Sequence, residues 1–113
     1  REVASRYLDM LSDSQLILPF VPDWAEPVWH LFVIRLKERD KLIDHLDSKG
    51  IGTIIHYPIP PHKQKAYSEE GFNEISLPIA EKMAKEIISL PMGPHLHSEE
   101  VKAIIESIRD FQE

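Results

Sequence analysis

The sequence predicts one small α/β domain of the two-layer α+β type, in which helices cover a small, mostly antiparallel sheet. A length of 113 residues with 42% apolar and 28% charged side chains is typical of a single globular domain. Two apolar runs rich in β-branched residues predict strands, at residues 30–36 and 53–57. Three segments with apolar residues at helical spacing predict the covering helices, at residues 39–49, 78–88 and 99–111.

The N-terminal segment is predicted to be an amphipathic helix followed by an extended connector. Apolar side chains recur at helical spacing before Asp13 and Ser14, where the helix should end: Val3, Tyr7, Leu8 and Leu11. The connector, residues 16–28, combines large apolar side chains with three prolines: Pro19, Pro22 and Pro27. Because proline removes a backbone donor, this connector cannot form regular internal hydrogen bonds, and its apolar side chains are expected to lie against another surface.

A strand, a helix and a second strand are predicted next. Residues 30–36 form a nearly continuous apolar run, which is typical of a strand covered on both faces. The helix over residues 39–49 has an apolar stripe and is followed by Gly50, where a left-handed residue commonly ends a helix. The second strand, residues 53–57, runs directly into Pro58.

Proline and polar residues define the loop that follows. Residues 58–61 (PIPP) lack three of four backbone donors and should be a stiff extended loop. Residues 62–67 are predicted to form one short helical turn, and residues 68–73 a surface loop.

The C-terminal part is predicted to contain two helices joined by a short extended piece. The first helix covers residues 78–88, and residues 89–94 are expected to be extended with a turn. Ser98 is the predicted N-cap of the last helix, where a hydroxyl can accept a backbone hydrogen bond. The apolar face of this helix is Val101, Ile104, Ile105, Ile108 and Phe111.

Composition excludes several classes of protein. The net charge of −6, with scattered basic residues, does not fit a nucleic-acid binder. No apolar run reaches the roughly 20 residues of a membrane span, and the N-terminus does not resemble a signal peptide. The absence of cysteine is compatible with a reducing cytoplasm, which is the expected location. The chain does not begin with Met, so we expect it to be a piece of a longer protein.

Most motifs of catalysis or cofactor binding are missing. Gly50 and Gly52 lie between a helix and a strand, whereas a phosphate-binding loop follows a strand and opens a helix. No serine lies in a nucleophile elbow, and no His-Glu-x-x-His metal motif occurs. The closest pair of histidines, His95 and His97, is better interpreted as part of a solvated turn than as metal ligands, so no metal site is predicted.

His56 and Tyr57 form the one pair of residues whose position suggests binding. They stand at the end of a predicted strand, where side chains are well oriented, with a stiff proline loop behind them. Imidazole and phenol can donate or accept hydrogen bonds, which suits sugar hydroxyls or phosphate oxygens. The alternative is that His56 bonds a backbone carbonyl and Tyr57 caps the core. By the same reasoning, His30 is interpreted as a satisfied histidine at a strand end.

An ordered set of motifs resembles the C-terminal small domain of DegT/StrS-type sugar-nucleotide aminotransferases, which are pyridoxal-phosphate enzymes of the aspartate aminotransferase superfamily. The resemblance covers nearly the whole chain. Its motifs are residues 28–35 (VWHLFVIR), 39–40 (RD), 50–67 (GIGTIIHYPIPPHKQKAY), 77–81 (LPIAE) and 89–94 (SLPMGP). These motifs are most similar to those of enzymes that aminate dTDP-linked keto-6-deoxyhexoses. One departure is Glu26-Pro27, where a small polar residue would be expected.

The resemblance implies a fold, a cofactor and partners. Residues 1–113 would be the small domain of a fold-type I aminotransferase, with residues 1–15 as the tail of an interdomain helix and residues 16–28 as the connector. The large N-terminal domain of such enzymes carries the Schiff-base lysine and the pyridoxal phosphate site. No catalytic or cofactor-binding residue is therefore expected in this chain, which should be inactive alone. The complete enzyme would be a homodimer that uses an amino donor such as glutamate.

The resemblance also implies which residues bind substrate. His56 and Tyr57 should line the sugar-nucleotide pocket, and the weaker candidates are His30, His62 and Tyr67. A different interpretation stays open: a freestanding ligand-binding or regulatory α/β module of this size would have the same periodicity. The length of the encoding reading frame distinguishes the two, because the module requires no upstream transaminase domain.

Overall fold

The computed structural model describes residues 1–111, and it has the predicted α+β architecture. Three short 3-10 helices, η1 to η3, occupy the loop between the second and third α-helices. The elements in chain order are α1 (Glu2–Met10), β1 (Phe32–Arg35), α2 (Arg39–Ser48), η1 (Pro61–Lys63), η2 (Lys65–Glu70), η3 (Phe72–Glu74), α3 (Pro78–Glu86), β2 (Ile87–Leu90) and α4 (Ser98–Arg109). None of the helices in this described part is long and apolar enough to cross a membrane.

The sheet consists of β1 and β2, which pair antiparallel with Phe32 opposite Leu90 and Arg35 opposite Ile87. Single bridges extend the sheet on both sides: Ile17 pairs with Arg35, and Ile54 pairs with Ser89. The antiparallel two-layer prediction is confirmed, but the partner of β1 is a strand that the sequence analysis did not predict.

Two predicted segments are corrected by the sheet. Residues 53–57 do not form a strand, since only Ile54 pairs and the prolines that follow provide no donors for further pairing. The helix predicted over residues 78–88 ends at Glu86, and Ile87 begins β2 in an extended conformation. Ile87 and Ile88 satisfy the spacing of the helix face as well as a buried strand does, so periodicity could not separate the two.

One face of β1 is buried, whereas the sequence predicted that both faces would be covered. Phe32 and Ile34 are inaccessible to solvent, while Val33 and Arg35 stay partly exposed. The ring of Phe32 lies 5.0 Å from that of Tyr7. The Tyr7 hydroxyl donates a 2.9 Å hydrogen bond to the Pro91 carbonyl, and burial raises the pKa of this phenol well above its usual range. The phenol is therefore a neutral donor inside the core.

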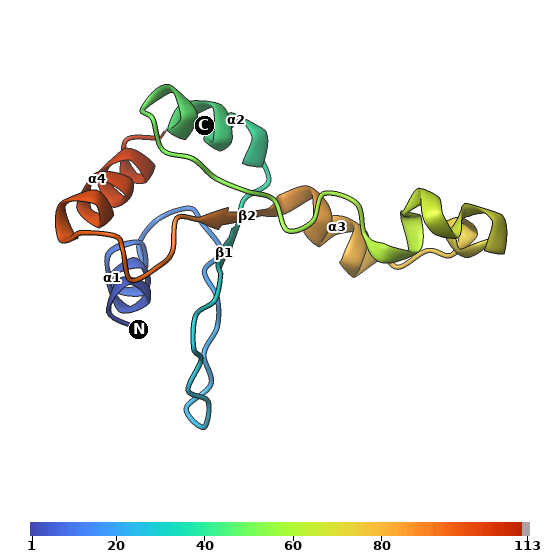
Figure 1. The fold of residues 1–113 in the computed structure, drawn as a ribbon, viewed down its shortest axis with the longest axis horizontal. Coiled ribbons are helices and arrows are strands. Elements are labelled where there is room, and N and C mark those ends of the chain that lie inside the picture. Colours follow the sequence, from blue (N-terminus) through green and yellow to red (C-terminus); the bar gives the residue numbers. More distant parts are fainter. Residues whose placement is uncertain (112–113) are drawn as a thin grey trace.

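The core lies among α1, α2, α4 and the sheet. Helix α4 contacts both α1 and α2, and these three helices lie together on one side of the sheet in Figure 1. Its N-cap is His97, whose backbone N–H donates to the Glu100 carboxylate in a capping box. The predicted N-cap, Ser98, is instead the first helical residue, and its hydroxyl accepts a hydrogen bond from Arg6. At the end of α2, Gly50 adopts the predicted left-handed conformation with φ of 73°.

Two parts of the chain extend away from this core (Figure 1). The connector leaves the sheet as a long, narrow loop, whose two sides run next to each other, and returns at β1. The η1–η3 segment and α3 form an arm on the opposite side of the sheet from the other helices. Helix α3 buries only Ala84, so it does not cover the sheet as predicted, and Ile79 on its apolar face is 76% exposed.

Candidate functional site

Ser89 and the segment before the proline loop meet at the centre of the candidate site. The Ile54 N–H donates to the Ser89 carbonyl at 3.3 Å, and the Ser89 N–H donates to the Ile54 carbonyl at 2.8 Å. Two residues further along, Nδ1 of His56 lies 2.9 Å from Oγ of Ser89. These three contacts hold the end of the loop segment against β2, and they fix the position of the His56 ring.

A pocket of about 250 Å³ opens beside this junction, and it is lined by three histidines: His30, His56 and His95. Thr53 and Ser89 are the other polar side chains of the lining, which contains no carboxylate, lysine or arginine. Neutral imidazoles can donate and accept hydrogen bonds, so the pocket suits an oxygen-rich neutral or anionic ligand. Among the described residues, no three histidine or acidic side chains are arranged to hold a metal ion.

His95 reaches this pocket because Gly93 leaves room for its ring. A Cβ atom added at Gly93 would lie 2.6 Å from Nδ1 of His95, which is far inside contact distance. From its sequence context His95 is expected in a solvated turn, and Ser89 is not expected to belong to a site. Local sequence does not predict that Ser89 meets His56, since the two residues are 33 positions apart in the chain.

Tyr57 lies next to His56 but outside the lining of the pocket. The two rings meet edge to face with centroids 5.5 Å apart, and the peptide bond between the residues is cis. The Tyr57 side chain is 69% exposed. The phenol is therefore free to contact a molecule that covers this face.

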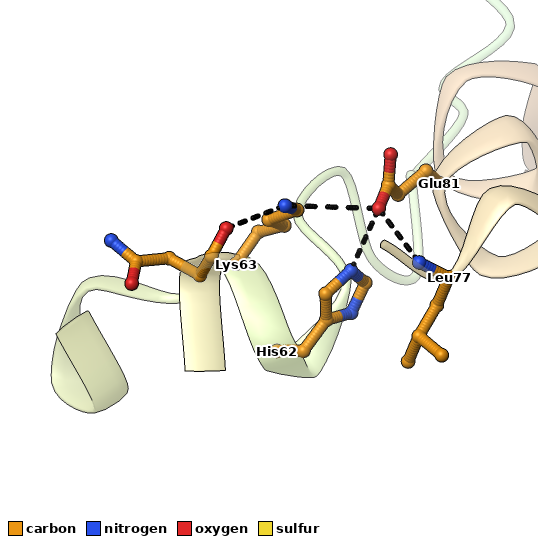
Figure 2. Close-up of polar contacts among 5 residues, drawn as sticks. His62, Lys63, Leu77 and Glu81 are labelled. Carbon is orange, nitrogen blue, oxygen red and sulfur yellow. Dashed lines mark hydrogen bonds and ion pairs between the residues drawn. The ribbon is translucent and has the colours of Figure 1, made fainter. Parts of the chain in front are cut away.

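His62 is placed differently, because it is buried and hydrogen-bonded within the chain. Its Nε2 lies 3.0 Å from Oε1 of Glu81, which also accepts the Leu77 N–H at 3.0 Å (Figure 2). Lys63 approaches the same oxygen at 3.8 Å and donates to the Asn73 carbonyl. Glu81 thus ties η1 to the first turn of α3.

Tyr67 belongs to the same arm and lies outside the histidine pocket. Its ring meets Phe72 edge to face at 6.0 Å, and it is 45% exposed. The structure therefore brings His30 and His56 together, sets Tyr57 beside them, and places His62 and Tyr67 in the arm.

The hydrogen bonds that Glu81 accepts make the stability of the chain depend on pH. The hydrogen bond from His62, followed by that from the Leu77 N–H, lowers the pKa of the Glu81 carboxyl. A pKa that is lower in the folded state stabilises the fold above the unfolded pKa, and this stabilisation is lost as pH falls through the folded pKa. In urea titrations, we expect the stability advantage of wild type over Glu81→Gln to shrink between about pH 6 and pH 3. Glu69→Gln, an exposed carboxyl of η2, is the control, and an advantage that is constant with pH would contradict this role.

Known proteins match both the sequence and the fold. Residues 1–109 match the family model described as the DegT/DnrJ/EryC1/StrS aminotransferase family. A dTDP-3-amino-3,6-dideoxy-alpha-D-galactopyranose transaminase of Aneurinibacillus thermoaerophilus is 45% identical over 111 residues, which are 98% of this chain and 30% of that protein. The chain spans about 30% of the length of the curated relatives it matches.

Solved structures give the same result. The crystal structure of Streptomyces venezuelae DesV in complex with a ketimine intermediate matches with a TM-score of 0.91 and 42% identity, over 96% of this chain and 30% of that one. The PLP form of Spr1654 from Streptococcus pneumoniae, described as a putative sugar aminotransferase, matches with a TM-score of 0.84 and 29% identity, over 95% of this chain and 29% of that one. The matched sequence motifs and the shared fold lead to one conclusion: the chain belongs to the DegT/DnrJ/EryC1/StrS aminotransferase family.

Proposed function

We propose that this chain is the C-terminal small domain of a pyridoxal-phosphate-dependent transaminase that aminates a keto sugar nucleotide. The observation that carries the proposal is the 45% identity, over almost the whole chain, to a transaminase of a dTDP-3-amino sugar. The substrate would be a dTDP-keto-6-deoxyhexose, and an amino acid such as glutamate would donate the amino group. The complete enzyme would be a cytoplasmic homodimer.

Within this enzyme, His56, Tyr57 and His30 would contact the sugar nucleotide. The pocket of three imidazoles supports this role, since its lining offers hydrogen-bonding groups and no carboxylate to repel an anionic ligand. The exposed phenol of Tyr57 adds a further donor on the same face. His62 and Tyr67 stay weaker candidates, because the structure gives the first an internal partner and sets both in the arm.

We propose that the pyridoxal phosphate site lies outside this chain. Such a site needs a lysine for the Schiff base and an acidic partner for the pyridine nitrogen. Among the described residues, the histidine pocket has no lysine in its lining. We therefore assign the cofactor to the large domain of the complete protein, and we expect the chain alone to be inactive.

The exposed apolar side chains of the connector support the proposal that a large domain lies next to it. Phe20, Trp24 and Val28 in the connector are each more than 80% exposed, although apolar side chains of this size are costly to leave in water. In the complete enzyme the large domain would cover this connector.

The isolated chain is accordingly expected to self-associate. Light scattering and binding of a dye that detects apolar surface should both decrease in the Phe20→Ser/Trp24→Ser double variant, because it removes two large exposed apolar side chains. Asp23→Ser, in the same connector, is the control. A monodisperse wild-type chain without dye binding at high concentration would count against this expectation.

The function is tested with the full-length protein encoded by the gene. Incubation with pyridoxal phosphate, glutamate and a dTDP-3-keto-6-deoxyhexose should yield the amino sugar nucleotide, which mass spectrometry detects. The free keto sugar without its nucleotide is the control and should react much less. Failure to aminate any keto sugar nucleotide, with the cofactor bound, would refute the proposal.

A further inference from the structure

We propose that Ser89 is a positioning residue that holds His56 in the Nε2–H tautomer, so that the imidazole presents a hydrogen-bond donor to an oxygen of the ligand. The donor role toward substrate rests on the proposed function, whereas the tautomer does not. Ser89 is the first residue of the motif at residues 89–94, but that motif assigns no role to its hydroxyl.

Ser89 is an unusual residue for its place in the fold. It is 5% exposed and lies in β2 between Ile88 and Leu90, which are also buried. Because successive side chains of a strand point to opposite faces, its hydroxyl lies on the face opposite Ile88 and Leu90, where it lines the histidine pocket. A buried hydroxyl is costly unless it is hydrogen-bonded. The position therefore favours a serine that has a defined partner.

The backbone of Ser89 brings that partner within reach. Its N–H and its carbonyl both bond to Ile54 and thereby fix the segment that carries His56. The side chains of Ser89 and His56 then meet at 2.9 Å. The two backbone contacts hold the segment against β2, and the side-chain contact is the one hydrogen bond found for the ring among the described residues.

The direction of the side-chain hydrogen bond follows from the partners available. Among the described residues, Nδ1 of His56 is the one hydrogen-bond partner found for the Ser89 hydroxyl. If Nδ1 carried the proton and donated to Oγ, the hydroxyl proton would have no acceptor among the described residues, and such a loss is unfavourable. The hydroxyl therefore donates to Nδ1, and the proton of the neutral ring is on Nε2.

This tautomer determines what His56 can bind. Nε2 has no hydrogen-bond partner within the described part of the chain, so its N–H is available to a ligand. Because the pocket lining contains no carboxylate to take this donor, a ligand oxygen is the partner that fits: a hydroxyl, a carbonyl or a phosphate oxygen.

The tautomer is tested by solid-state ¹⁵N NMR of the full-length enzyme labelled at histidine, above the pH at which imidazoles titrate. The signal absent from His56→Ala identifies His56. We expect the Nε2–H pattern in wild type and in Ser89→Thr, which keeps the hydroxyl, and a mixture of tautomers in Ser89→Ala. Ser107→Ala removes another buried serine, from α4, and should leave the signal unchanged. An Nδ1–H pattern in wild type, or an unchanged pattern in Ser89→Ala, would overturn the proposal.

Kinetics test the donor role separately. Ser89→Ala should raise the KM for the sugar nucleotide about tenfold, with kcat changed about twofold, and Ser89→Thr should restore most of the affinity. In a His56→Ala background the same substitution should have almost no further effect. An equal effect of Ser89→Ala with and without His56 would show that the serine acts otherwise. An enzyme that does not turn over sugar nucleotides would refute the proposed function, while the NMR result would still decide the tautomer.

Discussion

Replacing Phe32 by alanine is expected to lower the free energy of unfolding by about 3–5 kcal/mol. The Phe32 side chain is fully buried at the start of β1, and its ring contacts Tyr7 at 5.0 Å and Trp29 at 5.3 Å. Truncation removes contacts between α1, Trp29 and the sheet at once, and leaves a cavity that these parts cannot easily close. This loss would be a large fraction of the stability of a typical domain.

Urea unfolding of the chain measures this effect. Val33→Ala, on the partly exposed face of the same strand, is the matched control and should cost about 1 kcal/mol. If Phe32→Ala prevents folding, Phe32→Leu should still destabilise by about 1–2 kcal/mol. Equal midpoints for Phe32→Ala and Val33→Ala would show that Phe32 is not at the centre of the core.

His56→Ala in the full-length enzyme is expected to reduce turnover of the sugar nucleotide more than tenfold, and Tyr57→Phe should do the same. The first removes the imidazole held against Ser89, and the second removes only the exposed phenol oxygen. Each would lose the hydrogen bond that we propose it makes to the sugar nucleotide, and such losses at a binding site commonly cost an order of magnitude or more.

The reduction should appear in kcat/KM while the cofactor remains bound. Cofactor absorbance and the Tm of each variant serve as controls, because neither side chain is proposed to hold the cofactor or the core. Kinetics equal to wild type in both variants would reduce this pair to a packing role. Lost absorbance would instead indicate that the change disturbs the cofactor site.

Local patterns in the sequence were sufficient for the elements whose apolar residues follow one period. Helices α2 and α4 were expected within two residues of their observed ends, because each has a clear apolar stripe. The centre of β1 was also found, since its β-branched run does not fit a helix of ordinary length.

The errors occurred where two physical requirements compete. Ile87 and Ile88 continue the apolar face of α3, but pairing with β1 draws them into β2. Residues 53–57 have strand composition, but the prolines behind them leave one bridge at Ile54. Both outcomes depend on tertiary pairing that periodicity does not contain.

The sequence predicted only part of the candidate site, for a related reason. His56 and Tyr57 stand out because they end a β-branched segment before a proline loop. Ser89 and His95 come from a different part of the chain, and only folding brings them to the same pocket. Local sequence carries no signal for such contacts, so the residue that holds His56 could be found only in the structure.

The structure of the full-length protein with a bound keto sugar nucleotide tests the central claim most directly. We predict that a ligand oxygen lies within hydrogen-bonding distance of Nε2 of His56, and another within reach of the Tyr57 hydroxyl. A sugar nucleotide that binds elsewhere, with both of these side chains enclosed and turned away from it, would contradict the claim.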